Sequence, residues 1–472
     1  MDDSLAMDAV DLAAMLARRE ISAEELMQAT LARIEAVNGE VNALVSLRDT
    51  GVLLAEARAM DNGPAQGPLH GLPLAVKDLF DVAGLPTVNG SPLFGQEPAR
   101  EDSPHVARAR AAGAIVVGKS NTPEFCIGSH TYNPVFGATQ NPHAPGLSCG
   151  GSSGGAAVAL ATGMVPLADG SDMMGSLRNP AGWNNVYGLR PTWGRVPGAR
   201  AGDLYMHPIS SNGPMGRSPR DIALQLDVMS GPAPYQPFGR DDAPVGMPDP
   251  AAPGRCIAWL GDWDGAWPME AGIGDLCLVA LDVLADQGTH IEAPGAPFSR
   301  EALWQSWTTL RSLGLAANLG ALYDAPDSRD ALKPEAIWEI EKGRALTGPE
   351  IIAASALRSD WLRRALELFE TYDALALPTA QVWPFPVDQT WPRDVAGQGM
   401  DTYHRWMEVV IPASLAGLPA LAMPAGFNDA GLPMGVQLIG RPGGEAGLLA
   451  LAEAYHRATR WPQTRPPELL TA

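Results

Sequence analysis

Helical spacing of apolar side chains dominates the N-terminal part of the chain. Within residues 8–38 the apolar positions recur every three to four residues, which places them on one helical face. Ser22 and Glu25 form the pattern of a capping box and mark a helix start inside this segment. Asn38-Gly39 predicts a left-handed helix stop, and a further helix is expected at 51–61. These helices carry no evident chemistry, so we expect them to serve packing.

Further along, short apolar runs alternate with helical patterns. The runs have the length and composition of buried strands, and they fall at 74–76, 114–117, 255–260, 373–378, 409–427 and 433–440. Helical patterns fall at 103–112, 219–230, 270–287, 326–372 and 445–459, and in the small-residue run after residue 155. This alternation predicts an α/β fold in which helices cover both faces of a sheet.

Composition and charge restrict the class of protein. The chain has 472 residues, of which 46% are hydrophobic and 18% charged, values typical of a globular protein with a large core. Its net charge of −20 argues against binding to nucleic acid or to anionic membrane surfaces. The N-terminus is acidic and no apolar run reaches membrane-spanning length. We therefore expect a cytoplasmic protein with a small-molecule partner, and a homodimer stays open.

The four cysteines indicate neither a disulfide framework nor a metal site. Cys126, Cys149, Cys256 and Cys277 show no paired CxxC spacing and no neighbouring histidine cluster. No metal and no cofactor is therefore expected. They fit a reducing compartment as small buried residues.

Two loops bear on domain organisation and on the pocket. Residues 231–253 contain seven prolines and are typical of a surface loop, but no composition change divides the chain, so residues 1–472 are expected to form a single domain. Residues 121–149 form a second proline- and glycine-rich loop, and such loops commonly wall a site. Phe125, Cys126 and Ile127 are candidate pocket residues, or equally core residues beneath the loop.

One motif is misleading. Residues 113–120, GAIVVGKS, match the phosphate-loop pattern G-x-x-x-x-G-K-S letter for letter. The four residues between the glycines are Ala-Ile-Val-Val, which favour a buried strand instead of a curled anion cradle. Pro123 follows too closely for a helix to begin at the lysine. We expect no nucleotide site here.

The candidate chemistry lies in two serine turns and a lysine. Ser152 and Ser153 sit inside the glycine-rich turn 150–155, Ser176 lies 24 positions after Ser152, and Lys77 ends the first apolar run. No G-x-S-x-G elbow surrounds either serine, and no histidine has a context that suggests a base. A lysine can act as a base only if burial lowers its pKa, which the run before Lys77 would favour. A serine in a glycine-flanked turn could then relay the proton.

At these three points the sequence resembles the amidase signature family. The match runs from about 66 to 196, with a looser echo at 373–379 and 409–459. The resemblance implies a mixed β-sheet core covered by helices on both faces. It also implies that Ser176 is the nucleophile of a Ser–Ser–Lys triad, that Ser152 bridges it to the base Lys77, and that a cis peptide follows Gly151. The reaction would pass through an acyl-enzyme that water hydrolyses.

The resemblance assigns supporting roles as well. The backbone N–H groups of Met173, Met174, Gly175 and Ser176 would form the oxyanion hole. Asp172 and Arg178 would brace the turn as a structural pair, and Ser153 would hydrogen-bond within the turn network.

Two departures from the family pattern indicate a specialised branch. Relatives usually carry Thr-Gly-Gly or similar before the nucleophile, where this chain has residues 173–175, Met-Met-Gly. They often carry Phe-Cys-Gly downstream, where this chain has 183–185, Trp-Asn-Asn. A methionine in place of glycine restricts the turn and fills space, so it could narrow the acyl side of the pocket.

Three functions follow from these observations. The leading one is a stand-alone hydrolase of linear amides, with esters and carbamates also open as substrates. All 13 tryptophans lie at or after Trp183, several of them in loop-like contexts. Core packing is the default explanation for them, and a hydrophobic substrate mouth is the alternative, which weakly favours an apolar or aromatic substrate. The alternatives are the glutamine-hydrolysing subunit of a tRNA-dependent amidotransferase and a non-catalytic ligand-binding pseudoenzyme.

Overall fold

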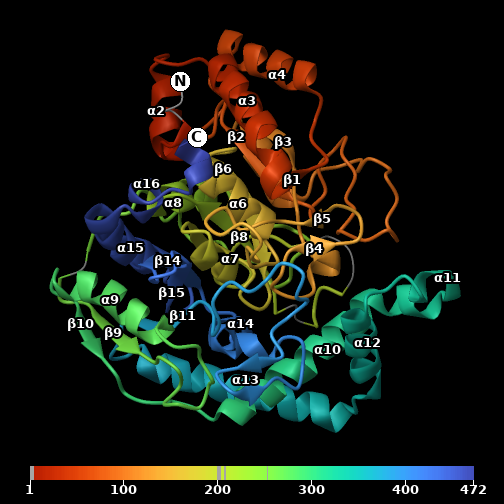
Figure 1. The fold of residues 1–472 in the computed structure, drawn as a ribbon, viewed down its shortest axis with the longest axis vertical. Helices are drawn as coiled ribbons and strands as arrows, with labels where there is room; N and C mark the ends of the chain where they lie inside the picture. Colours follow the sequence, from red (N-terminus) through yellow and green to blue (C-terminus); the bar gives the residue numbers. More distant parts are fainter. Residues whose placement is uncertain (1–4, 199–202, 207–208, 252, 472) are drawn as a thin grey trace.

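An eleven-stranded mixed sheet runs through the computed structural model, which describes residues 5–198, 203–206, 209–251 and 253–471 (Figure 1). In sheet order the strands are β1 (Leu44–Val45), β3 (Ile115–Ser120), β2 (Pro73–Lys77), β6 (Leu167–Asp172), β8 (Ser211–Gly216), β7 (Tyr187–Arg190), β14 (Ala420–Phe427), β15 (Pro433–Ile439), β11 (Ala374–Pro378), β9 (Cys256–Trp259) and β10 (His290–Glu292). Two short hairpins lie outside it: β4 (Tyr132–Asn133) with β5 (Gly137–Ala138), and β12 (Asp394–Val395) with β13 (Gln398–Gly399).

Strand direction brings two segments of the site to one edge. Strands β3, β2 and β6 are parallel neighbours, whereas β6, β8, β7, β14 and β15 pair antiparallel. Leu74 of β2 pairs with Leu167 of β6, so both strands run toward the same edge. The carboxyl ends of parallel strands open together there, which places Lys77 near Asp172.

Helices pack on both faces of the sheet, as expected for this fold class. On one face lie α6 (Gly154–Ala161) and α7 (Arg178–Trp183), which contact each other, and on the other lie α8 (Pro219–Met229), α15 (Glu445–Thr459) and α9 (Ile273–Ala285). The remaining α-helices are α2 (Ala9–Ala17), α3 (Ala23–Val41), α4 (Thr50–Asn62), α5 (Pro104–Ala111), α10 (Arg300–Asp324), α11 (Pro326–Arg329), α12 (Pro334–Ala345), α13 (Gly348–Leu368), α14 (Ile411–Leu415), α16 (Trp461–Thr464) and α17 (Glu468–Thr471). Two 3₁₀ helices complete the described elements, η1 (Glu124–Cys126) and η2 (Arg405–Val410). No helix among the described residues is both long and apolar enough to span a membrane.

The N-terminal helices begin as expected but end differently. Ser22 caps α3 through the predicted box, since its side chain accepts from Glu25 N and the Glu25 carboxylate accepts from Ser22 N. The predicted stop at Asn38-Gly39 is wrong, because α3 continues to Val41 and Asn42 adopts the left-handed conformation with φ 51°. The Asn42 side chain donates to the carbonyl oxygens of Phe136 and Ala138, which holds the helix end there.

Two further segments differ from the prediction. The strand-like pattern at 409–415 lies in η2 and α14, and β14 begins only at Ala420. Helix α10, with 25 residues, falls outside the segments expected to be helical.

The motif at 113–120 is a buried strand for most of its length, and the ammonium of Lys119 faces Asp78 at 3.5 Å. That arrangement leaves no phosphate cradle.

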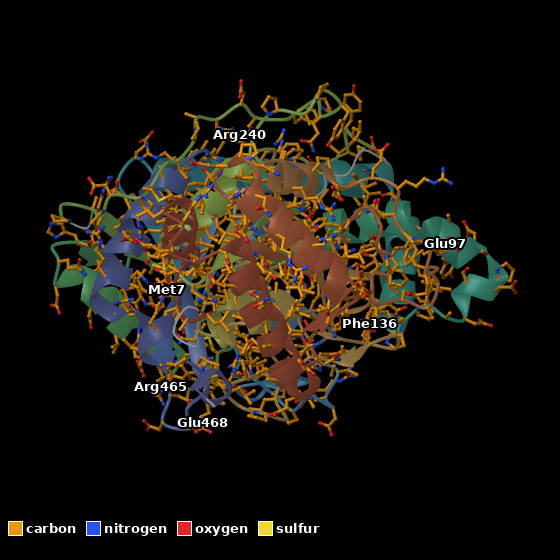
Figure 2. The ribbon with its side chains drawn as sticks, turned by 90° about the horizontal axis from the view of Figure 1, so that it is seen from above. Met7, Glu97, Phe136, Arg240, Arg465 and Glu468 are labelled. Carbon is orange, nitrogen blue, oxygen red and sulfur yellow. The ribbon has the colours of Figure 1, made fainter. Side chains whose placement is uncertain are left out.

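The tryptophans of the C-terminal half are mainly core residues. Trp263 and Trp267 stack with ring centroids 4.6 Å apart inside the larger of the apolar cores. Trp259, Trp383 and Trp391 are partly buried against the same core. The described residues of 231–253 form neither helix nor strand, and Figure 2 shows the segment that carries Arg240 along the outside of the molecule.

Candidate active site

A buried lysine surrounded by hydroxyl groups is the centre of the site. Lys77 is the last residue of β2 and its side chain is fully buried. Its Nζ lies 2.7 Å from Ser152 Oγ, 3.0 Å from Ser153 Oγ and 3.1 Å from Ser171 Oγ. Burial lowers the pKa of Lys77, and the nearby Cys126, Asp169 and Asp172 only partly oppose this shift. A neutral amine at this position can accept a proton from a serine hydroxyl.

The turn that carries Ser152 is held from several sides. The Gly151–Ser152 peptide bond is cis, as the family resemblance implies. Gly151 N donates to Asn179 Oδ1 at 3.2 Å, and Thr131 Oγ1 donates to the carbonyl of Gly150 at 2.8 Å. These bonds fix the orientation of Ser152 toward Lys77.

The histidine nearest this turn is neutral and structural. Burial lowers the pKa of His130 to about 4. Its Nε2 faces the carbonyl of Val387 at 2.9 Å and therefore carries the proton, so Ser148 Oγ donates to Nδ1 at 2.8 Å. Ser148 in turn accepts from Gly150 N at 3.1 Å. His130 thus stabilises the glycine turn and reaches no candidate nucleophile through these bonds.

Ser153 and Ser171 connect the lysine to the second serine turn. Ser153 N donates to the carbonyl of Ser176 at 3.2 Å, which places the turn of Ser176 directly against that of Ser152. Ser171 was not among the residues expected in the site, although it precedes Asp172 at the end of β6. The parallel pairing of β2 with β6 could have revealed it, because both strands end at the same edge.

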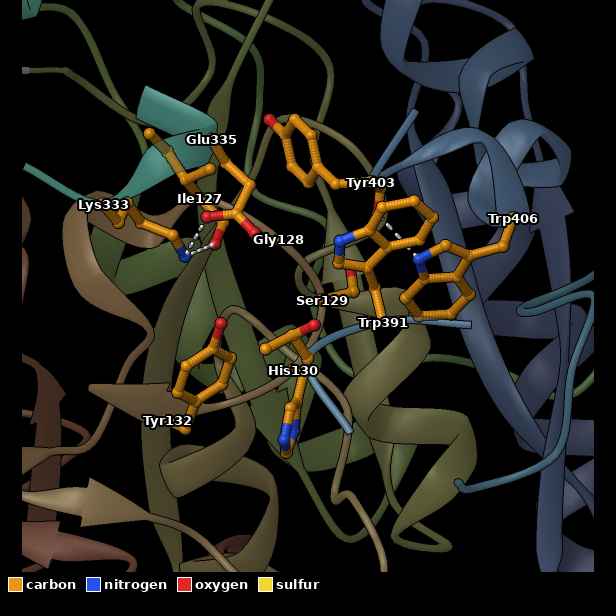
Figure 3. A pocket seen from close by; sticks show the side chains of 11 residues that line it. Ile127, Gly128, Ser129, His130, Tyr132, Lys333, Glu335, Trp391, Tyr403 and Trp406 are labelled. Atoms are coloured by element: carbon orange, nitrogen blue, oxygen red, sulfur yellow. Dashed lines mark hydrogen bonds and ion pairs between the residues drawn. The ribbon is translucent and has the colours of Figure 1, made fainter. Parts of the chain in front are cut away.

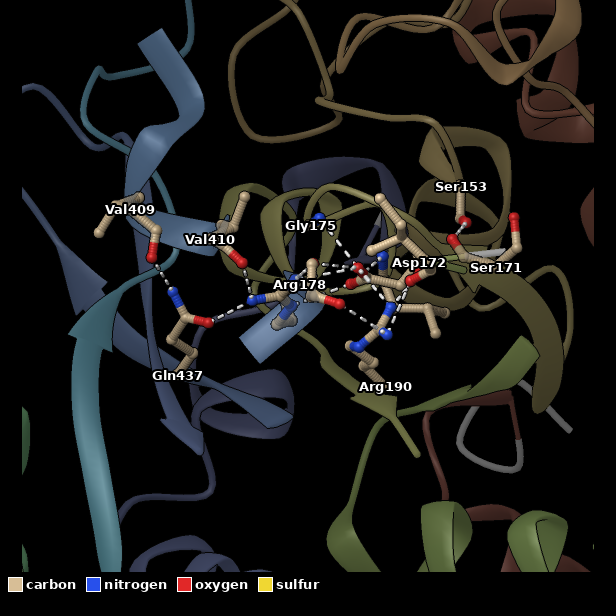
Figure 4. A network of polar contacts seen from close by, with 12 residues as sticks. Ser153, Ser171, Asp172, Gly175, Arg178, Arg190, Val409, Val410 and Gln437 are labelled. Atoms are coloured by element: carbon tan, nitrogen blue, oxygen red, sulfur yellow. Dashed lines mark hydrogen bonds and ion pairs between the residues drawn. The ribbon is translucent and has the colours of Figure 1, made fainter. Parts of the chain in front are cut away.

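The turn around Ser176 is built on the Asp172 carboxylate (Figure 4). Oδ1 accepts from Gly175 N at 2.9 Å, and Oδ2 accepts from Leu177 N at 3.2 Å. Arg178 donates to both oxygens from Nε and Nη2, at 2.9 Å each, and both side chains are fully buried. Burial alone would raise the pKa of Asp172, but Arg178, Arg190 and the N–H groups outweigh it and hold the carboxylate ionised.

The backbone donors of this turn are not equivalent. The Gly175 N–H group donates to Asp172. It is therefore not free to act as an oxyanion donor, although the sequence predicted that role for it. Within the described residues, the N–H groups of Met173, Met174 and Ser176 have no hydrogen-bond partner. Gly175 has φ +78°, and a Cβ there would approach the side chain of Val410 to 2.9 Å, so glycine is required at this point.

Arg178 also joins the turn to the C-terminal half of the chain. Its Nη1 donates to the carbonyl of Val410 at 2.9 Å and to Gln437 Oε1 at 2.5 Å, and Nη2 donates to Ser414 Oγ at 2.7 Å. Gln437 Nε2 donates to the carbonyl of Val409 (Figure 4). It also donates to the carbonyl of Pro378. The turn of Ser176 is therefore positioned by residues more than 200 positions away in the sequence.

A small pocket lies next to the glycine turn (Figure 3). Its lining comes from the 127–132 loop, from the start of α12, from the segment before η2 and from η2 itself. It comprises Ile127, Gly128, Ser129, His130, Tyr132, Lys333, Glu335, Thr390, Trp391, Tyr403 and Trp406. A Cβ on Gly151 would lie 3.1 Å from backbone atoms of Ser129 and His130, so the pocket wall touches the turn of Ser152. In Figure 3, Lys333 and Glu335 lie on one side and the aromatic rings of Tyr403, Trp391 and Trp406 on the other.

Of the three expected pocket residues, one lines the pocket and two do not. Ile127 lines the pocket. Phe125 packs edge-on against Phe94, with ring centroids 5.9 Å apart, and Cys126 Sγ lies 3.1 Å from Thr122 Oγ1. Neither belongs to the pocket lining, although Cys126 is close enough to Lys77 to influence its pKa.

The unusual Trp-Asn-Asn segment has a structural explanation. Trp183 is fully buried and stacks on Trp406 of the pocket lining, with ring centroids 6.0 Å apart. Asn184 Nδ2 donates to the carbonyls of Cys149 and Pro180, and Asn185, in the left-handed region with φ 57°, donates to the carbonyls of Trp461 and Arg465. The segment thus supports the pocket wall and the turn before Ser152.

Comparisons with known proteins give one consistent family and fold. A family model described as Amidase matches residues 25–449. The chain is 36% identical to the A subunit of the glutamyl-tRNA(Gln) amidotransferase of Chloroflexus aurantiacus, over 96% of each chain, and 32% identical to an acylamidase of Rhodococcus erythropolis, over 98% of each. A bacterial aryl acylamidase of the amidase signature family superimposes with a TM-score of 0.90 at 26% identity, covering 99% of this chain and 98% of that one. The A subunit of the glutamyl-tRNA(Gln) amidotransferase of Thermotoga maritima superimposes with a TM-score of 0.77 at 28% identity, covering 92% and 91%.

Proposed function

The chain belongs to the amidase family, and on this premise we propose that it hydrolyses small-molecule amides through a serine acyl-enzyme. The contact between Lys77 Nζ and Ser152 Oγ, 2.7 Å apart in a fully buried environment, is the observation that carries the proposal. A lysine with a lowered pKa supplies the base that the histidines do not.

Proton transfer then runs through the two serine turns. Neutral Lys77 takes the proton of Ser152 while Ser152 takes that of Ser176, and Ser176 Oγ forms a bond to the substrate carbonyl carbon. The bond that holds Ser153 N to the carbonyl of Ser176 supports the required closeness of the turns. The C–N bond breaks as the proton returns through Ser152 to the leaving amine. Water next attacks the acyl-enzyme, gives its proton to the same relay and releases the acid.

Backbone donors would stabilise the charge on the carbonyl oxygen. The N–H groups of Met173, Met174 and Ser176, which have no acceptor within the described residues, are our candidates for the oxyanion hole. Gly175 N–H serves the turn instead, because Asp172 accepts it. Preorganised donors of this kind commonly contribute about 2.7–4 kcal/mol each to transition-state stabilisation.

The aromatic residues beside the glycine turn are our ground for proposing apolar or aromatic amides. Tyr132, Trp391, Tyr403 and Trp406 present rings to the pocket, and aromatic side chains bind flat apolar groups through large contact areas. Esters offer the same acyl carbonyl with a better leaving group, and carbamates offer a carbamoyl carbonyl with an alcohol as leaving group, so we propose both as secondary substrates.

A second function, the glutamine-hydrolysing subunit of a tRNA-dependent amidotransferase, is favoured by the relatives at 36% identity. Two observations favour the stand-alone hydrolase over it. The superposition on the aryl acylamidase is closer than that on the amidotransferase subunit, with TM-scores of 0.90 and 0.77. In addition, residues 173–174 are two methionines, where relatives usually carry Thr-Gly or similar.

Labelling with a small fluorophosphonate tests the nucleophile before any substrate is known. We expect one adduct on Ser176, no adduct in Ser176→Ala, and labelling slowed at least about 100-fold in Lys77→Ala. Ser211→Ala is a matched control, because Ser211 is buried at the strand position opposite Asp172 and its hydroxyl has no partner among the described residues. No adduct on the folded protein would refute the proposal and favour the ligand-binding pseudoenzyme.

Hydrolysis assays then separate the two catalytic functions. We expect release of nitroaniline from aromatic and aliphatic nitroanilides by the purified chain alone. Glutaminase activity that exceeds anilide hydrolysis, or that depends on a copurifying partner, would instead support the amidotransferase subunit.

A further inference from the structure

A buried ionic cluster lies behind the nucleophile turn, on α10 and α12. Arg311 Nε donates to Glu339 Oε1 at 2.7 Å, and its Nη2 donates to the Tyr403 hydroxyl at 2.7 Å. Tyr403 and Ser312 donate to the two oxygens of Glu339, at 2.8 Å and 2.5 Å. The side chain of Arg311 is 5% exposed and that of Glu339 is fully buried. Two of the three guanidinium nitrogens are thus well satisfied.

The third nitrogen of Arg311 has only a weak acceptor. Nη1 lies 3.0 Å from the thioether sulfur of Met173, which is a poor hydrogen-bond acceptor. Met173 is only partly buried, whereas its neighbours Asp172 and Met174 are buried. A buried guanidinium that lacks a strong acceptor on one side is unusual, because unsatisfied buried donors are costly. The contact therefore leaves a strong donor available beside the catalytic turn.

The location of this donor connects it to the substrate. Met173 lies three residues before Ser176 in the turn that follows β6. Tyr403, which accepts from Arg311, also lines the pocket, where Figure 3 labels it beside Trp391. Methionine side chains are flexible and adapt readily to a ligand. A substrate group that displaces the thioether would reach Nη1 without any change in the ionic cluster.

The charge of the cluster selects the kind of group that fits. Burial opposes ionisation of Glu339, but Arg311 outweighs it and holds the pKa of Glu339 below its usual range. Burial lowers the pKa of the adjacent His404 to about 3, so this ring is neutral. The positive charge of Arg311 is therefore already balanced by Glu339. A carboxylate on the substrate would add a second, uncompensated negative charge, whereas a neutral acceptor would not.

We propose that Arg311 is a specificity-determining residue that binds a neutral hydrogen-bond acceptor, such as a ketone or a second amide carbonyl, on the acyl part of the substrate. This acceptor takes the place of the Met173 sulfur at Nη1. The inference rests on the proposed amide hydrolysis and names its preferred substrates: amides whose acyl chain carries a second carbonyl group. Met173 serves as the stand-in acceptor when no such substrate is bound.

A substrate series tests the proposal. The nitroanilides of hexanoic acid, of three oxohexanoic acids with the ketone at successive carbons, and of adipic acid as its monoanilide share one leaving group and nearly one length. For the wild type we expect kcat/KM of the best oxo substrate to exceed that of the hexanoyl anilide about tenfold, because a hydrogen bond from a charged donor is gained. The adipic monoanilide should fall below the best oxo substrate.

Two variants change the preference in different directions. Arg311→Lys keeps a cation for Glu339 but removes the planar fork, so the preference should fall to about unity. Met173→Leu removes the competing sulfur and should preserve or increase the preference. Arg344→Lys is the matched control, since Arg344 forms an exposed paired contact with Asp324 between α10 and α12 and should leave the ratio unchanged.

Each outcome decides the matter. A wild-type ratio near unity, an unchanged ratio in Arg311→Lys, or a loss of preference in Met173→Leu would overturn the inference, as would a clear preference for the adipic monoanilide. If Arg311→Lys does not fold, the wild-type series and Met173→Leu still decide. Hydrolysis of the hexanoyl anilide without an oxo preference refutes this inference alone, whereas failure to hydrolyse any anilide, together with no adduct on Ser176, refutes the proposed function as well.

Discussion

Replacing Asp172 by asparagine removes the charge on which the turn of Ser176 is built. The carboxylate accepts four bonds of 2.9–3.2 Å, from Gly175 N, Leu177 N and two nitrogens of Arg178, and a longer one of 3.5 Å from Ser414 Oγ. An asparagine has one carbonyl oxygen and a donor NH₂ in place of the second oxygen. At least two of the four bonds are therefore lost, and one N–H group is turned toward another. Arg178, fully buried, also loses its charge partner.

The expected cost follows from these losses. Each hydrogen bond to a charged group contributes about 1.5–3 kcal/mol, so two of them amount to about 3–6 kcal/mol. Removal of one partner of a buried ion pair costs about 3–5 kcal/mol by independent measure. We therefore expect the free energy of unfolding to fall by about 3–5 kcal/mol. This is a large share of the stability of an ordinary domain, and the turn of Ser176 should lose its order first.

Urea unfolding followed by tryptophan fluorescence measures this loss. Asp242→Asn is the matched control, because Arg240 also holds Asp242 with two hydrogen bonds, at 2.6 and 2.7 Å. This pair is partly exposed, since 35% of the Arg240 side chain and 20% of the Asp242 side chain are accessible to solvent. Such exposed pairs contribute about 0–1 kcal/mol. Equal costs for the two variants would refute the reasoning, since burial would then have no effect on the contribution of the pair.

The pH dependence provides a further check on Asp172. Its pKa in the folded state lies below the usual value, so its contribution is fully present above the unfolded pKa of about 3.9 and disappears as pH falls through the lower folded value. The difference between wild type and Asp172→Asn should hence be the same at pH 5 and pH 8. A difference that shrinks between these two values would contradict an ionised Asp172.

Three other changes test separate parts of the structure. Because burial lowers the pKa of Lys77, kcat/KM for a nitroanilide should rise with pH and reach its plateau below the ordinary lysine pKa of 10.5. Lys77→Arg should reduce kcat/KM by about 10²–10⁴-fold. A pH-independent profile would contradict a lysine base. Gly155→Ala would bring a Cβ within 2.3 Å of Asn121 N, so we expect a loss of about 1–3 kcal/mol in urea unfolding, whereas Gly274→Ala, with no atom within 4 Å, should be neutral or stabilising. Asn42→Ala should lower the melting temperature more than Asn42→Gly, because only glycine tolerates φ 51° there without strain; equal shifts would show that the side-chain bonds matter more than the backbone.

The sequence predicts the fold class and indicates the candidate site residues for clear physical reasons, and the family resemblance adds their proposed roles. Small residues surround Ser152 because two backbone turns must approach closely, and a lysine after an apolar strand is buried because the strand is central. Such constraints restrict residue types at fixed positions and so can be recognised in a single sequence. The capping box of α3 belongs to the same class, since it depends only on neighbours along the chain.

Features that depend on distant contacts could not be predicted. The end of α3 was misplaced because Asn42 is held by the backbone at Phe136 and Ala138, and nothing near Asn38-Gly39 reveals that contact. The engagement of Gly175 N by Asp172 is local but depends on the turn geometry. Phe125 and Cys126 were assigned to the pocket only by their position in a loop, and small rotations of that loop decide which side chains face inward.

The features that could be predicted and those that could not come from different parts of the chain, and these parts have different proposed roles. The residues of the proposed reaction, from Lys77 to Ser176, come from one continuous part of the chain. The groups that orient the turn and limit the acyl site, among them Gln437 and Arg311, come from the C-terminal half and reach the turn through single contacts with Arg178 and Met173. On the proposed function, we expect substitutions in that half to change which amide is cleaved while the chemistry is preserved. Two chains with the same serine and lysine pattern need not share a substrate, and the contact between Arg311 and Met173 is where we expect this chain to differ.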